Sequence, residues 1–112
     1  MKKINLHIIL FFVFCINCIA QNSYQLAVLK YGGGGDWYAN PSSLKNLAFF
    51  CNKNLNMNID ENYSIVEPNS QNLFEHPFIY MTGHGNVVFT QSEINNLKKY
   101  LMGGGFLHID DN

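Results

Sequence analysis

The sequence PFIYMTGHG, residues 77–85, decides the fold class of this chain of 112 residues. Residues 77–82 form a nearly continuous apolar run, which is typical of a strand buried on both faces, and the run ends at once in Gly83-His84-Gly85. Residues 24–31 (YQLAVLKY) repeat this pattern and end in four glycines. Two buried strands of this kind predict a parallel sheet that is covered by helices.

The segments between and after these strands predict helices. Asn40-Pro41 supplies a cap residue and a proline for the first helical position. The apolar residues that follow at helical spacing are Leu44, Leu47, Ala48, Cys51 and Leu55. Residues 90–93 (TQSE) form a capping box before a second helix, whose apolar stripe is Ile94, Leu97 and Leu101 and which ends at Gly103.

Short strands are predicted at residues 63–67 and 105–110, with one helical turn at residues 70–75. Strands that alternate with helices at this spacing predict one α/β domain with right-handed crossovers. We expect a flavodoxin-like, three-layer parallel sheet with the strand order 2-1-3-4. Only Asp111 and Asn112 follow the last strand, so we expect residues 21–112 to be the N-terminal part of a domain truncated after about four strands.

Residues 1–20 have the layout of a secretory signal peptide, with Lys2 and Lys3 before an apolar stretch at residues 8–16 and a small-residue exit at Ala20. The apolar stretch is shorter than a membrane-spanning helix requires. A retained anchor is the alternative. We therefore expect an exported protein, periplasmic or secreted, with no stable membrane span after cleavage.

All seven basic residues are lysines, and the absence of arginine disfavours nucleic acid as a partner. Residues 21–112 hold five lysines and eight acidic residues, which gives a net charge of −3. They also hold one cysteine, Cys51, on the apolar side of the first helix. We expect it to be a small buried hydrophobic residue rather than a reactive thiol.

The carboxyl ends of the first and third strands mark the candidate site, because open parallel sheets bind ligands where the strand order reverses. Two loops meet there, residues 32–40 (GGGGDWYAN) and residues 83–86 (GHGN), beside the end of the last strand. The candidate ligand-binding residues are Gly32, Gly33, Gly34, Gly35, Asp36, Trp37, Tyr38, Gly83, His84, Gly85, Asn86, His108 and Asp111. The candidate catalytic residues are His84, Asp36 and Asp110.

The glycine loop does not match either nucleotide-binding motif. Trp37 stands where the dinucleotide fingerprint needs a glycine, and the Gly-Lys-Ser/Thr ending of the phosphate loop is absent. A nest of backbone amides for a carboxylate or an oxyanion remains one interpretation of the four glycines, and a plain turn is the other. Asp36 beside Trp37 and Tyr38 suits a sugar, although the two rings suit packing equally well.

His84 is held between two glycines, where an imidazole can serve as a base, an acid or a metal ligand. Side chains alternate along a strand, so His108 and Asp110 share one face, and Asp111 points away or begins the loop. These two residues with His84 and Asp36 form a candidate cluster for zinc or another divalent ion. The alternative is that His108 and Asp110 only bind neighbouring loops. No other cofactor is indicated.

Three stretches carry a resemblance to a known family: YGGGGDWYANPSSLKNL, PFIYMTGHGNVVFT and LKKYLMGGGFLHIDDN. They resemble the bacterial family called domain of unknown function 4159 over nearly all of residues 26–112. The resemblance implies a class I glutamine amidotransferase-like fold, which trehalose-utilisation proteins share, and it implies that roughly the second half of the domain is missing. Amidotransferases of this fold place a nucleophilic cysteine in a strand-to-helix turn, whereas Cys51 lies on a helix, so glutamine hydrolysis is not expected.

Two functions from different classes fit these residues. The first is an exported domain that binds a small polar ligand, with carbohydrate as one candidate class, through the glycine loop, Trp37 and His84. The second is a hydrolase, with or without a divalent metal, in which His84 acts with Asp36 and Asp110 while the amides of Gly32–Gly35 stabilise an oxyanion. A scaffold without a pocket function is the remaining alternative, and protein partners are not indicated.

Overall fold

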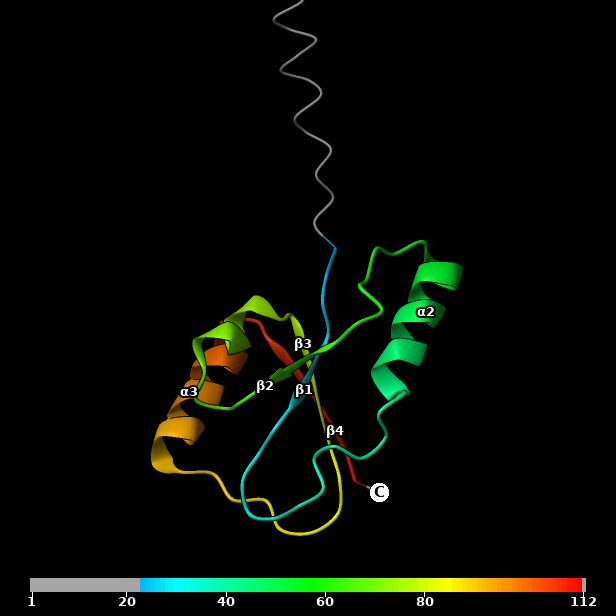
Figure 1. The fold of residues 1–112 in the computed structure, drawn as a ribbon. Coiled ribbons are helices and arrows are strands. Elements are labelled where there is room, and N and C mark those ends of the chain that lie inside the picture. The colour runs from blue at the N-terminus through cyan, green and yellow to red at the C-terminus, as the bar shows by residue number, and fades with distance from the viewer. Residues whose placement is uncertain (1–22, 112) are drawn as a thin grey trace, which may run out of the picture.

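The computed structural model describes residues 23–111, and the predicted signal peptide lies outside these residues. Four strands form one sheet in the order β2-β1-β3-β4, and all neighbouring strands are parallel. The strands are β1 (Ala27–Leu29), β2 (Ser64–Val66), β3 (Phe78–Thr82) and β4 (Phe106–Asp110) (Figure 1). This is a flavodoxin-like arrangement, and it confirms the predicted fold class and strand order.

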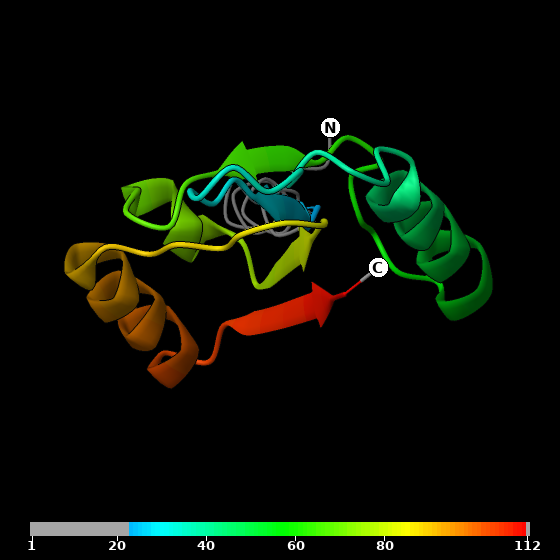
Figure 2. The ribbon, with the colours of Figure 1, turned by 90° about the horizontal axis from the view of Figure 1, so that it is seen from below.

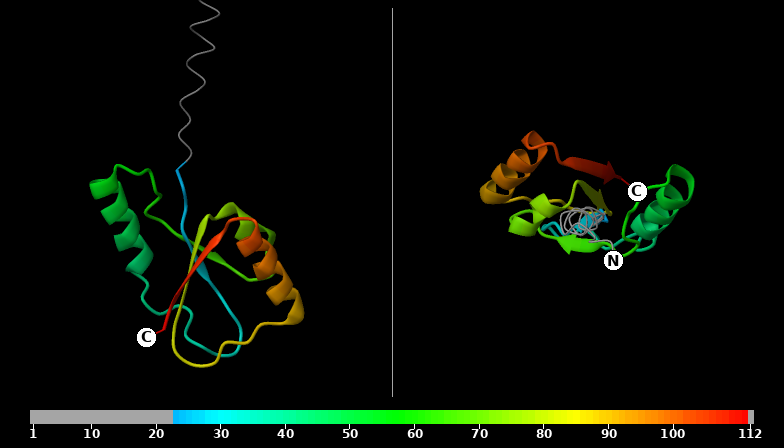
Figure 3. Two further views of the ribbon diagram at one scale, coloured as in Figure 1. Left: turned by 180° about the vertical axis from the view of Figure 1, so that it is seen from behind. Right: turned by 90° about the horizontal axis from the view of Figure 1, so that it is seen from above.

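One helix lies on each face of the sheet. Helix α2 (Ser43–Leu55) joins β1 to β2, and α3 (Gln91–Met102) joins β3 to β4. These two crossovers run in opposite directions along the sheet, so right-handed connections place their helices on opposite faces. The views from below and above show α2 and α3 on either side of the strands (Figures 2 and 3).

The buried apolar side chains divide between the two faces by the alternation of the strands. Ala27, Leu29, Ile79 and Met81 form one cluster with residues of α3, while Val28 and Tyr80 form a second cluster with Leu44 and Ala48 of α2. Complete burial of a side chain such as Leu29 or Ile79 contributes about 1.5–3 kcal/mol each. The sheet is therefore held from both sides, as a three-layer structure requires.

The predicted start of the first helix is wrong. Asn40 does not cap the helix, because its backbone is left-handed, with φ of 59°, and its Nδ2 donates to Oγ1 of Thr82 at 3.3 Å. Helix α2 begins at Ser43, after Ser42, whose side chain makes no capping bond. The Asn40 side chain thus joins the loop after β1 to the end of β3 and leaves the helix to start later.

The second helix begins as predicted and packs differently. Oγ1 of Thr90 accepts from the backbone N–H of Glu93 at 3.3 Å, and the Glu93 carboxylate accepts from the N–H of Thr90 at 2.6 Å, which confirms the capping box. Leu97 is buried, but Ile94 and Leu101 remain about half exposed. Tyr100 is buried in their place, so the predicted stripe is displaced around the helix.

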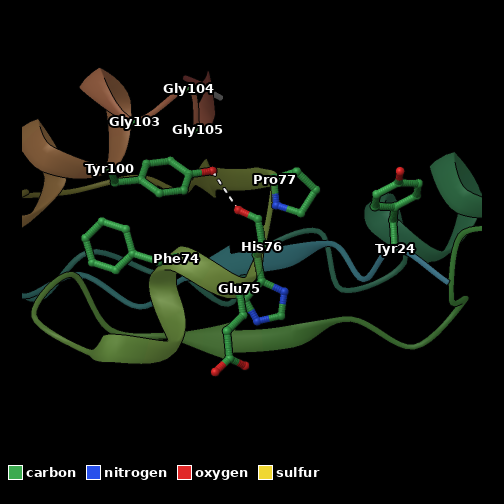
Figure 4. Close-up of a pocket in the computed structure, with 9 residues that line it drawn as sticks. All are labelled: Tyr24, Phe74, Glu75, His76, Pro77, Tyr100, Gly103, Gly104 and Gly105. Atoms are coloured by element: carbon green, nitrogen blue, oxygen red, sulfur yellow. Dashed lines mark hydrogen bonds between the residues drawn. The ribbon is translucent and has the colours of Figure 1, made fainter. Parts of the chain in front are cut away.

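Tyr100 ties three elements together at the amino-terminal edge of the sheet. Its hydroxyl lies 3.0 Å from the carbonyl oxygen of His76, at the end of the 3-10 helix η1 (Gln71–Glu75) (Figure 4). It also lies 3.1 Å from the carbonyl oxygen of Phe106. Gly105 passes directly over the ring, because an added Cβ there would lie 2.2 Å from Tyr100 Cζ.

The first and second strands are shorter than predicted. Tyr24 makes an isolated bridge with Ile59 outside β1, and β2 covers only Ser64–Val66 of the five residues expected. Leu47 and Leu55 of α2 are also exposed, so this helix buries fewer of its apolar residues than its periodicity predicts. Among the described residues, no helix is long and apolar enough to cross a membrane.

Candidate functional site

The loop after β1 and the loop after β3 are bound to each other at the carboxyl-terminal edge of the sheet. The Gly35 N–H donates to the carbonyl of Asn86 at 3.2 Å, and the Asp36 N–H donates to that of His84 at 3.1 Å. Farther along, the N–H of Val88 donates to Gly32 at 2.9 Å. The two predicted loops therefore meet where the strand order reverses.

Asp36 and His84 form a pair within these loops. One carboxylate oxygen of Asp36 accepts from the backbone N–H of His84, and Oδ2 lies 3.7 Å from Nδ1 of the same imidazole. The side chain of His84 is 66% exposed and that of Asp36 is 38% exposed. The carboxylate thus lies beside an imidazole that stays open to solvent.

The side chain of Tyr31 leaves no room for a Cβ atom at Gly35 or Gly83. Its buried hydroxyl donates to the carbonyl of Thr82 at 3.1 Å. A Cβ at Gly83, whose φ is +127°, would lie 2.6 Å from this hydroxyl oxygen, and a Cβ at Gly35 would lie 2.7 Å from the Tyr31 ring. These glycines are required because the two loops close around a tyrosine ring.

Burial raises the pKa of the Tyr31 phenol above its ordinary value, and the negative charge of Asp36 raises it further. The phenol therefore keeps its proton at neutral pH, and the proton holds the hydrogen bond to Thr82. Tyr31 acts here as a neutral donor inside the site.

Not all backbone amides of the four-glycine loop are free for the predicted oxyanion nest. The N–H of Gly35 is already bonded to Asn86, as described above. Gly33 and Gly34 have left-handed backbones, with φ of +104° and +87°, and a Cβ on Gly34 would meet nothing within 4 Å. The open part of the loop is therefore at Gly34.

A hollow of about 270 Å³ lies beside the loops, at the carboxyl ends of β3 and β4. Four predicted site residues line it: Gly83, Gly85, Asp110 and Asp111. The other lining residues are Tyr31, Met81, Thr82, Val87 and Ile109. The hydroxyl of Tyr80, a residue of the α2 cluster that does not line the hollow, donates to Oδ2 of Asp110 at 2.8 Å.

Trp37 and Tyr38 lie at a second, smaller hollow of about 160 Å³, which Tyr63 and Asn40 also line. The two rings meet edge to face with centroids 5.6 Å apart. Trp37 is partly buried and packs against both core clusters, whereas Tyr38 is 67% exposed. Tyr38 is therefore the freer aromatic surface for a ligand.

His108 and Asp110 both contact Tyr80, as their predicted common face requires. The His108 ring stacks on Tyr80 at 5.8 Å and on Phe78 at 6.2 Å, and it does not line the hollow. Within residues 23–111, no group of three or more His, Cys, Asp or Glu side chains is close enough to hold a metal ion together. His84 and Asp36 are thus paired without His108 and Asp110.

Sequence reasoning missed Tyr31, Tyr80 and Asn40 as residues that build the site. Tyr31 and Tyr80 belong to apolar runs, which indicate core, and their hydroxyls bond to Thr82 and Asp110. A tyrosine near the end of a buried strand needs a partner for its hydroxyl, and this was the available signal.

A further hollow, of about 320 Å³, lies at the opposite edge of the sheet, around Tyr100 and the end of η1 (Figure 4). It contains none of the predicted site residues. Its lining residues are Tyr24, Phe74, Glu75, His76, Pro77, Tyr100, Gly103, Gly104 and Gly105.

No curated protein is detectably similar to the chain. A family model described as "Domain of unknown function (DUF4159)" matches residues 25–112, which is most of the chain. The interlocked loops, the paired Asp36 and His84 and the adjoining hollow all lie within this match. The chain therefore belongs to the DUF4159 family.

Proposed function

We propose that the hollow at the carboxyl ends of β3 and β4 binds a small polar ligand, and that carbohydrate is the favoured class. The observation that carries this proposal is the position of Asp110 and Asp111 in a hollow beside Gly83 and Gly85. Glycines let a ligand approach the backbone, and carboxylates accept hydrogen bonds from hydroxyl groups.

The charge of the lining narrows the class of ligand. The residues that line the hollow include Asp110 and Asp111 and no lysine. A ligand with hydroxyl or amino groups complements these acceptors, whereas a phosphate or a carboxylate would meet like charge. Tyr38, which is exposed at the smaller hollow in the loop after β1, offers a ring on which the apolar face of a sugar can pack.

The test is binding of the full chain to a glycan array and a peptide array, followed by titration of any hit. We expect Asp110→Asn and Tyr38→Ala each to weaken binding about tenfold, the loss of one good polar or packing contact. Asp60→Asn is the matched control, because the Asp60 carboxylate bonds within its own turn to Asn62, outside the hollow. No hit on either array, or equal affinity in all variants, would refute the proposal.

The exposed Asp36–His84 pair favours a second candidate, a hydrolase. A carboxylate 3.7 Å from Nδ1 can orient the imidazole so that its other nitrogen accepts a proton from water. Asp36 and His84 also provide one oxygen and one nitrogen ligand, so metal dependence belongs to this second proposal. A glycoside and ester panel with elemental analysis tests it; activity that survives His84→Ala, or neither metal nor activity, would exclude it.

We further propose that the sheet is of the class I glutamine amidotransferase-like type, on the strength of the sequence resemblance and the flavodoxin-like strand order. Glutamine hydrolysis is not part of the proposal, because Cys51 lies half-buried on α2 and not in a strand-to-helix turn. We expect the protein to release no ammonia from glutamine. Ammonia release by the parent protein that disappears in Cys51→Ser would contradict this expectation.

Export rests on the pattern of residues 1–20 and is also a proposal. Mass spectrometry of the protein recovered from the exported fraction should find Gln21 at the N-terminus. An intact N-terminus beginning at Met1 in that fraction would instead indicate a retained anchor.

A further inference from the structure

The outward half of α2 carries aromatic and basic side chains. Leu44 and Ala48 face the sheet and are buried. At 100° per residue, Phe49 and Phe50 lie on opposite sides of Lys53, on the half of the helix turned away from Ala48. Phe49 is 54% exposed and Phe50 is 59% exposed.

The charge of α2 differs in sign from that of the chain. Ser43–Leu55 contains Lys45 and Lys53, both exposed, and no Asp or Glu. The whole chain carries a net charge of −1. Helix α2 is therefore a local basic surface on a protein that is otherwise acidic.

The lysines and the exposed rings belong to one surface. Nζ of Lys53 lies 5.8 Å from the centroid of the Phe49 ring. Two further exposed apolar side chains lie at the end of the helix: Leu55, its last residue, on the side of Ala48, and Met57 just beyond it. Apolar patches that are rimmed by charged residues mark interaction surfaces. Figures 1 and 3 show that neither the strands nor α3 cover the outer side of α2.

We propose that α2 docks on the surface of an anionic lipid bilayer. The helix has 13 residues, too short to cross, and it lies in the plane of the interface. Phe49 and Phe50 enter the boundary between headgroups and acyl chains, while Lys45 and Lys53 extend along their stems to the lipid phosphates.

Charge selects this occupant over a second copy of the chain. Two α2 helices face to face would bring their lysines together with no carboxylate between them. An anionic bilayer instead complements both lysines and accepts two adjacent phenylalanines without a shaped pocket. An acidic protein surface would also complement the lysines, but it would need pockets for the two phenylalanine rings. The exposed rings therefore favour the bilayer over an acidic protein.

The experiment is hydrogen exchange of the full chain, read in the peptide that spans residues 43–57, with and without vesicles. Vesicles of phosphatidylglycerol mixed with phosphatidylcholine should protect this peptide. Vesicles of phosphatidylcholine alone should bind about tenfold or more weakly, because each lysine contributes separately to the attraction. Reading this one peptide separates α2 from any binding by residues 1–20, which all variants retain.

Three variants complete the design. Phe49→Ser with Phe50→Ser, and Lys45→Gln with Lys53→Gln, should each abolish the protection. Lys98→Gln with Lys99→Gln on α3 makes the same charge change on the other face and should leave it intact. All positions are exposed, and thermal unfolding confirms that each variant folds.

The opposite results are equally clear. Equal protection by neutral and anionic vesicles, or no protection by either, overturns the proposal. Protection that appears without vesicles as protein concentration rises identifies a second copy as the occupant. Protection by polyglutamate that persists in the double Phe variant identifies an acidic protein surface, and both of these outcomes overturn the lipid assignment.

Discussion

The carboxylate of Asp36 contacts His84 twice, once at the backbone N–H and once, at 3.7 Å, at Nδ1 of the imidazole. The two residues are 48 positions apart, and this pair joins the loops after β1 and β3. The same carboxylate therefore joins the two loops and lies beside the exposed ring.

Asp36→Ala should loosen the loop after β3. It removes the acceptor of the His84 N–H, and the loss should be about 1 kcal/mol because the pair is partly exposed. Amide exchange at His84 should accelerate by about the corresponding factor of five. Asp36→Asn keeps an acceptor oxygen and should exchange more slowly than Asp36→Ala; equal rates in both variants would show that the hydrogen bond contributes nothing.

Gly83→Ala should destabilise the domain by at least about 2 kcal/mol, because it combines a left-handed backbone with a clash against the Tyr31 hydroxyl. Gly34→Ala is the matched control in the facing loop. It has the backbone cost alone, about 1 kcal/mol, since a Cβ there meets open space. Urea unfolding at equilibrium measures both, and similar losses would contradict the packing around Tyr31.

Stability should fall as the pH rises above about 10, the ordinary pKa of tyrosine. The pKa of Tyr31 is raised in the folded protein, so between the unfolded and folded pKa values the unfolded chain loses a proton that the folded chain retains. The contribution is complete below pH 10 and is lost as the pH climbs through the folded pKa. Burial raises the pKa of Tyr100 as well, and it adds to the same loss.

Tyr31→Phe should reduce this alkaline loss, although it also removes the hydrogen bond to Thr82. Tyr38→Phe is the control, because it removes the hydroxyl of a mostly exposed tyrosine in place of a buried one. Thermal unfolding between pH 8 and pH 11 gives the comparison, and an identical slope in Tyr31→Phe and the parent protein would count against the role of Tyr31.

Thr90→Ala should cost about 1 kcal/mol, because it breaks the reciprocal bonds with Glu93 at the start of α3. Ser42→Ala at the start of α2 should cost a few tenths of that, since the Ser42 side chain makes no capping bond. For a domain of this size, 1 kcal/mol lowers the Tm by about 4–8 °C. Equal shifts in Tm would mean that the capping box is not formed in solution.

Two buried strands and the second helix were predictable because their signals are local. Apolar runs identified β1 and β3, and the spacing of Thr90 and Glu93 fixed the start of α3 within its own first turn. The order β2-β1-β3-β4 agrees with the flavodoxin-like order that we expected for such a sheet.

The start of α2 was not predictable, because a distant contact decides it. Asn40 is followed by proline and resembles a cap, yet its side chain bonds to Thr82, 42 residues away. The same limit applies to α3, where two carbonyl partners bring Tyr100 inward in place of Ile94 and Leu101.

The candidate site was predicted in its location and not in its construction. Both loops lie at the expected edge, and Asp36 and His84 meet there. The sequence does not distinguish a glycine that exposes the backbone to a ligand from a glycine that leaves room for an aromatic ring. Only the position of Tyr31 distinguishes Gly35 and Gly83, which pack against it, from Gly34, which faces open space.

Four hydrogen bonds join the two loops, three between backbone groups and one to the Asp36 carboxylate. Neither loop can swing aside as a lid without breaking several of them at once. The entrance to the hollow beside these loops is therefore preformed, and a ligand binds without a prior loop movement. Association should follow a single exponential whose rate increases in proportion to ligand concentration, with no slower opening step that sets a plateau.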